Sequence, residues 1–289
     1  MKTSVIGYPR IGAQRELKFI TERYFRGDAG NEELLHTAAR LRHEHWKSMQ
    51  GIDYIPCNDF SLYDTTLDCA WMLGLVPQRY RHLGLSDLDT YFAMARGHQG
   101  EAGDVHALPM KKWFNTNYHY IVPEIGDDAV VSARPGKAVR EFAEARELGI
   151  KARPVLTGPF TFLKLALFTG SRKASDIAAE VADAYTRVIA RLGEAGAEWV
   201  QLDEPALVRD LSAEDLALFE SLWQPLLAGK GAVKILLETY FGDVRDIYER
   251  LIALPVDGLG LDFIEGRCTA ELIARHGFPA DKVLFAGLV

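Results

Sequence analysis

Residues 199–240, WVQLDEPALVRDLSAEDLALFESLWQPLLAGKGAVKILLETY, contain two apolar runs that flank one longer amphipathic stretch. The runs at 199–204 and 233–240 are short and almost continuously apolar, which is typical of strands buried on both faces of a parallel sheet. Ser212 precedes the amphipathic stretch and is expected to cap a helix that ends near Gly229. The sequence therefore predicts one strand–helix–strand unit here.

The same alternation extends in both directions along the chain. Further strand-like runs lie at 4–7, 54–57, 153–158, 258–264 and 283–289, and helical patterns lie at 15–25, 175–196, 244–254 and 269–277. Counting the aromatic stretch around 115–120 as another strand gives eight. Eight alternating units predict a closed (β/α)8 barrel. An open doubly wound sheet is the alternative, although no GxGxxG motif follows the first strand.

The predicted eighth strand, 283–289, coincides with the last residue of the sequence. A complete barrel would continue into an eighth helix that covers the outer face of this strand. We therefore expect a (β/α)8 domain over residues 1–289 that lacks its last helix and belongs to a longer protein.

The composition excludes several classes of protein. The 289 residues are 48% hydrophobic and 25% charged, and the net charge of -7 argues against a general nucleic-acid surface. No run of about 18 apolar residues is present, and the start, MKTSVIGYPRIG, is too polar for a secretory signal. Cys57, Cys69 and Cys268 are odd in number and widely spaced. This pattern indicates reduced thiols, and we expect a cytoplasmic protein.

Polar residues follow most of the predicted strands, where barrel enzymes place their sites. Any one of these polar residues could occur simply because strand ends meet solvent. Together they favour a binding site at the open end of the barrel. They are Tyr8, Arg10, Asn58, Asp59, Asn117, His119, Asp203, Glu204, Glu238, Tyr240 and Asp262.

The loop GYPRIGAQRELK, residues 7–18, leads into a predicted helix with Arg15 and Lys18 in its first turn, on one face. Cations there oppose the helix dipole. An anionic ligand docked on the free N–H groups and the two cations would explain them. The alternative is that Arg15 and Lys18 are solvated surface residues.

The stretch KKWFNTNYHYIVPE, residues 111–124, combines lysines, amides and many rings. Lys112 could add a third cation at the same mouth, and the rings could stack on a flat ligand. Alternatively, the rings are buried and structural, with the lysines at a solvated strand start. The first reading indicates a ligand that is flat at one end and polyanionic at the other.

Metal and nucleophile motifs are missing from the sequence. The histidines of HEH, 43–45, fall on different faces of a helix, and the cysteines have no partner at CxxC or HxC spacing. Asp203 and Glu204 are adjacent in a strand and are expected to point in opposite directions. We predict no metal ligand and no catalytic residue in this chain.

Several long strings resemble the amino-terminal half of the cobalamin-independent methionine synthase family. They are GYPRIGAQRELK, DFSLYDTTLDCAWMLG, KWFNTNYHYIVPE, VQLDEPAL, LETYFGDV and AGLV, and the similarity runs along the whole chain. The resemblance implies two facing (β/α)8 barrels that transfer a methyl group from 5-methyltetrahydropteroyltri-L-glutamate to homocysteine, making methionine. It implies that zinc and homocysteine are bound by a carboxyl-terminal barrel, through His, Cys, Glu and Cys ligands. Consistent with that division, this sequence has ETYFG at 238–242, where a zinc-bearing barrel would offer HxC.

The resemblance also assigns residues. The polyglutamate tail of the folate is expected on Arg15, Glu16, Leu17, Lys18 and Lys112. The pterin ring is expected mainly in the other barrel, so the rings at 113–120 become structural, while Asn117, His119 and Asp203 remain further candidates. We expect this chain to supply tail binding and one wall of the cleft, and to be inactive alone.

Two alternatives remain open. One is a stand-alone barrel that binds folate or another anion without catalysis. The other is a barrel similar to uroporphyrinogen decarboxylase, an enzyme that needs no metal, although the quoted strings do not suggest it.

Overall fold

The structure is a computed structural model that describes all residues from 1 to 289. Its centre is a six-stranded sheet in which every neighbouring pair of strands is parallel. In spatial order the strands are β1 (Ile55–Cys57), β5 (Ala152–Thr157), β7 (Trp199–Asp203), β8 (Lys234–Glu238), β9 (Gly258–Asp262) and β10 (Val283–Gly287). Ser4 forms a parallel bridge with Tyr54, so the first residues extend the sheet beside β1.

Three aromatic rings show that this sheet is strongly curled. Tyr54 and Phe285 come from opposite ends of the strand order, yet their ring centroids are 5.9 Å apart. Trp199, from a middle strand, lies 6.2 Å from Tyr54 and 5.8 Å from Phe285. The rings fill the inside of the curl, as side-chain layers fill a barrel. No backbone hydrogen bond joins β10 to residues 4–7. The predicted barrel class is therefore confirmed, in the form of an incomplete barrel.

The stretch around 115–120 does not contribute a barrel strand, which corrects the count of eight. β2 (Met110–Lys112) and β3 (His119–Ile121) pair with each other in an antiparallel hairpin, and β1 pairs directly with β5. Residues 113–118 form the turn, in which the amide of Thr116 donates to the carbonyl of Trp113 at 3.0 Å. The polar residues at 115–117 favour this turn over a strand. We refer to residues 110–121 as the hairpin.

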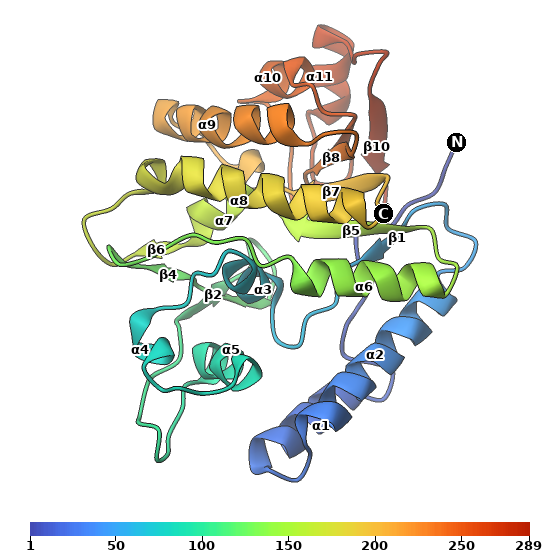
Figure 1. Cartoon of the computed structure of the whole chain (residues 1–289). Helices are drawn as coiled ribbons and strands as arrows, with labels where there is room; N and C mark the ends of the chain where they lie inside the picture. Colours follow the sequence, from blue (N-terminus) through green and yellow to red (C-terminus); the bar gives the residue numbers. More distant parts are fainter.

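The main helices cover the outer face of the curled sheet (Figure 1). They are α6 (Gly136–Glu147), α8 (Ala174–Glu194), α9 (Ala213–Gly229), α10 (Tyr248–Ala253) and α11 (Thr269–His276). α8 coincides with the helical pattern predicted at 175–196, and its buried residues include the stripe Ile177, Val181, Tyr185, Val188 and Leu192. Ser212 caps α9, because the amide of Asp215 donates to its hydroxyl at 3.1 Å. Both predictions are confirmed.

A second group of helices packs beside the barrel around its own core of 16 buried residues. These helices are α1 (Glu16–Arg26), α2 (Asn31–Ser48), α3 (Thr65–Met72), α4 (Gln78–Arg81) and α5 (Asp87–Arg96). In Figure 1, α1 and α2 lie side by side away from the sheet. The remaining elements are α7 (Pro159–Leu165), the 3-10 helix η1 (Pro205–Val208) and the short parallel pair β4 (Glu124–Ile125) and β6 (Leu167–Phe168). None of the helices is both long and apolar enough to span a bilayer.

Candidate functional site

A cavity of about 970 Å³ opens at the carboxyl ends of the sheet strands. The polar residues that line it from the sheet side are Tyr8, Asn58, Asp59, Thr157, Asp203 and Tyr240. Most of the other lining residues come from α2, α3, α5 and α6, and Trp113 of the hairpin and Arg134 also line the cavity. Several of the predicted polar strand ends therefore surround one space. Asn117, His119 and Asp262 are not among its lining residues.

Asp203 and Glu238 end two adjacent strands of the sheet. Asp203 accepts hydrogen bonds from Gln201 Nε2 at 2.6 Å and from the Tyr240 hydroxyl at 3.4 Å. Burial raises the pKa of Asp203 to about 7, although the bond from Gln201 and the charge of Arg153 lower it. Burial and the neighbouring Asp203 raise the pKa of Glu238 to about 8. Both carboxyl groups therefore titrate near neutral pH and are only partly ionised there.

Arg153 connects this acidic pair to the start of the chain. Its guanidinium is 1% exposed, and Nη2 donates to Ser4 Oγ at 2.9 Å and to the carbonyl of Val5 at 3.2 Å. Burial lowers the pKa of Arg153, while Glu238 and Asp203 favour its charged form. The bonds hold residues 4–5 against the sheet, and the charge balances the carboxyl groups inside the curl.

Glu204 points away from Asp203, as the strand alternation predicts. Its carboxylate accepts from the amides of Phe160 at 3.0 Å and Thr161 at 2.7 Å, and from Trp223 Nε1 at 2.9 Å. It is fully buried, and burial raises its pKa to about 7. These contacts join β7 to α7 and α9. Glu204 is therefore a structural residue and not the partner of Asp203 in acid–base chemistry.

The tip of the hairpin lies across the strand ends. The Phe114 ring is 5.5 Å from that of Phe241, which follows β8, and the Arg209 guanidinium lies 4.5 Å from the Phe114 ring. Asn115 Nδ2 donates to Glu265 Oε2 at 2.9 Å, beyond β9. Phe114 and Asn115 thus hold the hairpin tip at the strand ends, whereas Trp113 lines the cavity and Tyr118 is exposed.

Lys112 lies on the exposed part of this hairpin. It pairs in register with His119, and both side chains are exposed. Asn117 is exposed in the connecting turn. Because directly opposite residues of an antiparallel pair share a face, the structure brings Lys112 and His119 together.

The start of α1 differs from the prediction in one respect. The helix begins at Glu16, and Arg15 precedes it as the N-cap, in the left-handed conformation with φ 64°. Arg15 and Lys18 therefore do not share a helix face, because Arg15 is outside the helix. Arg15 is exposed and has no ion-pair or hydrogen-bond partner for its guanidinium, and Lys18 pairs only with Glu22 at 3.6 Å.

The other two residues of this segment have different contacts. Leu17 is 1% exposed, packs in the second core, and donates its amide to the carbonyl of Ile11. The Glu16 carboxylate accepts from the amide of Gln14 at 3.0 Å, and hydrogen bonds from backbone amides lower its pKa. The amide of Lys18 donates to no protein acceptor, whereas the Glu16 amide is bonded to the carboxylate of its own side chain. The Lys18 amide is an unpaired N–H group of the kind that a helix start offers to an anion.

The two cationic segments are connected through the second core, not by a direct contact. Leu17 and Ile20 of α1 belong to the same buried cluster as Leu108, which precedes β2, and Ile121, the last residue of β3. No hydrogen bond or ion pair links Arg15 or Lys18 to Lys112. None of these three cations lines the large cavity, whereas Asp203 does.

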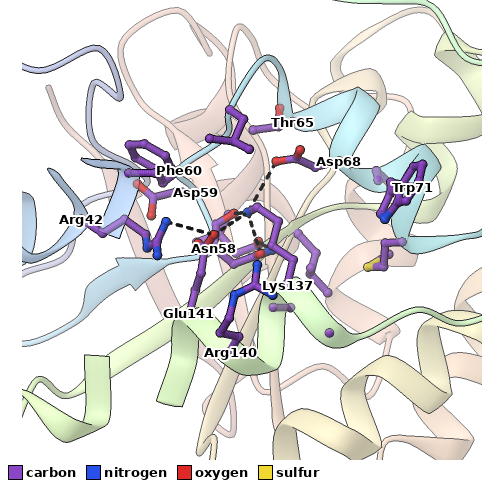
Figure 2. Close-up of a pocket in the computed structure, with 18 of the residues that line it drawn as sticks. Arg42, Asn58, Asp59, Phe60, Thr65, Asp68, Trp71, Lys137, Arg140 and Glu141 are labelled. Atoms are coloured by element: carbon purple, nitrogen blue, oxygen red, sulfur yellow. Dashed lines mark hydrogen bonds and ion pairs between the residues drawn. The ribbon is translucent and has the colours of Figure 1, made fainter. Parts of the chain in front are cut away.

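A charged network on the far side of the cavity was not predicted from the sequence. Lys137 Nζ lies 3.3 Å from Glu141 Oε1 and 3.4 Å from Asp68 Oδ2, and donates to Asn58 Oδ1 at 2.9 Å. Arg42 forms a bidentate ion pair with Glu144, in which Nε and Nη2 donate to the carboxylate oxygens at 2.7–2.9 Å. Its Nη1 lies 3.7 Å from Glu141 Oε1. Figure 2 shows Lys137 between Asn58, Asp68 and Glu141. The i,i+4 spacing of Lys137 and Glu141 was the available signal, but such pairs are usually solvated.

The side chains of this chain do not fit a zinc site. No group of three or more His, Cys, Asp or Glu side chains is arranged to hold a metal ion. Cys57 and Cys69 are buried, and burial raises the pKa of both thiols, which disfavours the thiolate that zinc requires.

Comparison with known proteins identifies close relatives. The chain is 54% identical over its whole length to the 5-methyltetrahydropteroyltriglutamate–homocysteine methyltransferase of Streptococcus gordonii, and 52% identical to that of Campylobacter jejuni subsp. doylei. It spans 39% of the length of each of these relatives.

Two solved structures share the fold at low sequence identity. One is a putative vitamin-B12 independent methionine synthase from Listeria monocytogenes, with TM-score 0.64 and 15% identity, covering 100% of this chain and 81% of that one. The other is a B12-independent methionine synthase from Shewanella sp. W3-18-1, in complex with selenomethionine. It has TM-score 0.61 and 17% identity and covers 90% of this chain and 72% of that one. The family model for the N-terminal domain of cobalamin-independent synthase matches residues 2–289, and the chain belongs to that family.

Proposed function

We propose that this chain is the amino-terminal part of an enzyme that transfers a methyl group from 5-methyltetrahydropteroyltriglutamate to homocysteine, forming methionine. Relatives that are more than half identical over the whole chain are named for this reaction. Within that enzyme, this chain would bind the polyglutamate tail of the folate and form one wall of the cleft.

The observation that carries the tail assignment is the exposed, unsatisfied start of α1. The Arg15 guanidinium has no protein partner, and the amide of Lys18 is free. Glutamate carboxylates are suitable ligands for both kinds of donor. Leu17 would contribute by anchoring the segment in the second core. The Glu16 carboxylate is already bonded to the amides of Gln14 and of Glu16 itself, so this residue would contribute by fixing the start of the helix.

Lys112 would add a further charge from the hairpin. It is exposed and stands beside His119, with Asn117 in the adjacent turn. His119 and Asn117 would then be neighbours of the same carboxylate chain. Asp203 lies in the cavity instead, and its protonated form could donate a hydrogen bond to a polar group there.

Methyl transfer needs a homocysteine thiolate and a protonated folate nitrogen. Zinc would supply the thiolate by coordination, and the residues of this chain do not fit a zinc site. The proposal therefore places zinc and homocysteine in a carboxyl-terminal barrel outside this sequence. We expect this chain by itself to catalyse no transfer.

The test compares two lysines that are adjacent in β2. Lys111 and Lys112 point to opposite faces of the strand, so Lys111→Ala is a matched control for Lys112→Ala. Each lost charge contact is worth about 1 kcal/mol at an exposed site. The double variant Lys18→Ala/Lys112→Ala should therefore bind the triglutamate folate at least about tenfold more weakly.

The measurement is calorimetric titration with 5-methyltetrahydropteroyltriglutamate and with the monoglutamate form. The proposal expects the monoglutamate affinity to stay unchanged in the double variant, and both affinities to stay unchanged in Lys111→Ala. Equal losses for the two folates in the double variant would show that these lysines do not bind the tail.

A further inference from the structure

Asp262 is a predicted polar strand end that does not line the large cavity. It is the last residue of β9 and is 9% exposed. Its carboxylate accepts four hydrogen bonds from backbone amides. Oδ2 accepts from Phe241 at 3.0 Å and from Gly242 at 3.2 Å. Oδ1 accepts from Ile264 at 2.7 Å and from Glu265 at 2.9 Å. Asp262 therefore ties together the loop that follows β8 and the loop that follows β9.

Both of these loops hold the tip of the hairpin. The centroid of the Phe241 ring lies 5.5 Å from that of the Phe114 ring. Glu265 Oε2 accepts a hydrogen bond from Asn115 Nδ2 at 2.9 Å. Phe241 and Glu265 thus bind Asp262 through their amides and the hairpin through their side chains. One residue in each loop therefore connects Asp262 to the hairpin tip.

The backbone is strained on both sides of the ring contact. Phe241 has a φ of 73° and Phe114 a φ of 49°. Only four non-glycine residues of the chain have a positive φ, and the other two are Arg15 and Asn58. Such residues adopt this conformation at an energetic cost, so it persists where surrounding contacts hold it and is concentrated at functional sites. The bonds from the Phe241 and Gly242 amides to Asp262 are contacts of this kind.

The hairpin carries Lys112, which the proposed tail site uses. Lys112 pairs in register with His119, and the next pair closes the turn, because the Trp113 amide donates to the Tyr118 carbonyl at 2.7 Å. A shift of the tip therefore moves the Lys112 side chain.

We infer that Asp262 is a positioning residue for the polyglutamate tail. It fixes the two loops that hold the hairpin tip, and so sets where the Lys112 ammonium group meets a carboxylate of the tail. Asp262 makes no hydrogen bond to the hairpin and acts through Phe241 and Glu265. The inference rests on the proposed function, since it deepens the role of Lys112.

Asp262→Asn tests the inference in the intact protein, with Asp257→Asn as the matched control. The asparagine keeps an oxygen for the amides of one loop but turns an NH₂ group towards the amides of the other, so one loop is released. Asp257 precedes β9 at its other end, where its carboxylate accepts from the Ile235 amide at 2.9 Å and pairs with Lys230 at 2.8 Å. Both variants lose contacts of the same kind, whereas only Asp262→Asn should loosen the hairpin.

Two measurements separate positioning from a general loss of stability. Hydrogen exchange at the Trp113 amide, which closes the turn, should become at least about tenfold faster in Asp262→Asn and stay unchanged in Asp257→Asn. Calorimetric titration with the triglutamate folate should show an affinity loss of about fivefold in Asp262→Asn, as in Lys112→Ala. Adding Asp262→Asn to Lys112→Ala should change this affinity by less than about twofold, because the residue acts through Lys112. The monoglutamate affinity should stay unchanged in every variant.

Unchanged exchange in the hairpin, or unchanged triglutamate affinity, in a folded Asp262→Asn protein would overturn the inference. An affinity loss that persists in full in the Lys112→Ala background would also overturn it. These outcomes leave the tail site standing, whereas no affinity loss in Lys112→Ala alone would refute the tail site itself, and the inference with it. If Asp262→Asn does not fold, Glu265→Ala removes the acceptor of Asn115 from an exposed position and is judged by the same measurements, with Glu271→Ala, exposed on α11, as its control.

Discussion

Replacing Gly158 by alanine should strongly destabilise the protein, because this glycine leaves room for the buried carboxylate of Glu204. A Cβ at position 158 would lie 2.2 Å from Glu204 Cδ and 2.4 Å from Oε1. No atom pair tolerates such an approach, so the carboxylate must move. Glu204 is fully buried and has no solvent to move into.

The size of the effect follows from the donors that this movement would leave behind. The amides of Phe160 and Thr161 and the indole N–H of Trp223 all donate to Glu204, at 2.7–3.0 Å. Each buried donor left unpaired costs about 1–3 kcal/mol. Losing all three bonds therefore lowers the free energy of unfolding by at least about 3 kcal/mol, and the entropic gain from a Gly→Ala change, about 0.4–1 kcal/mol, does not offset it.

The assay is urea unfolding followed by tryptophan fluorescence and circular dichroism. Gly136→Ala is the control, because its Cβ would meet no atom within 4 Å and it begins α6. This control should leave the stability unchanged or raise it by up to about 1 kcal/mol. A Gly158→Ala protein within about 1 kcal/mol of the parent would refute the structural role of Glu204.

Two further predictions concern buried charges. Because burial raises the pKa of Glu238 to about 8, from a usual value of 4.5, the folded protein holds more protons than the unfolded one between these values. The contribution of Glu238 to the unfolding free energy should therefore fall as the pH rises from about 5 to 8, by up to about 1.4 kcal/mol per pH unit. Glu238→Gln should flatten the slope measured in urea titrations by this amount, and an unchanged slope would contradict the assignment. Arg42→Ala leaves Glu141 and Glu144 without their guanidinium partner and should lower the free energy of unfolding by about 3–5 kcal/mol. Arg40→Ala removes only an exposed ion pair on the same helix and should lower it by less than about 1 kcal/mol. Equal melting temperatures for these two variants would contradict the network.

The second half of the fold could be predicted from the sequence because its local signals agree with one another. Strands β7, β8 and β9 are continuous apolar runs, and Ser212 marks the start of the intervening helix α9. Periodicity, capping and strand length all indicate the same units there. The hairpin was assigned incorrectly because aromatic residues favour strands in general, while the turn at 115–117 depends on short-range polar contacts.

The site could be predicted only in part. The polar strand ends around the cavity follow from the barrel fold, since the carboxyl ends of parallel strands meet at one side. The buried network of Lys137, Glu141 and Arg42 could not be predicted, because these residue types are mostly exposed and the sequence does not reveal which elements bury them. Arg153 is a similar case, since a charged residue in a strand is usually expected at a solvated position.

A structure of the protein with bound 5-methyltetrahydropteroyltriglutamate tests the central claim most directly. Our account predicts that carboxylates of the tail lie within hydrogen-bond distance of Arg15, of the free Lys18 amide at the start of α1, and of the Lys112 ammonium group. Tail density that occupies the cavity beside Arg140, or that contacts neither α1 nor the hairpin, would contradict it.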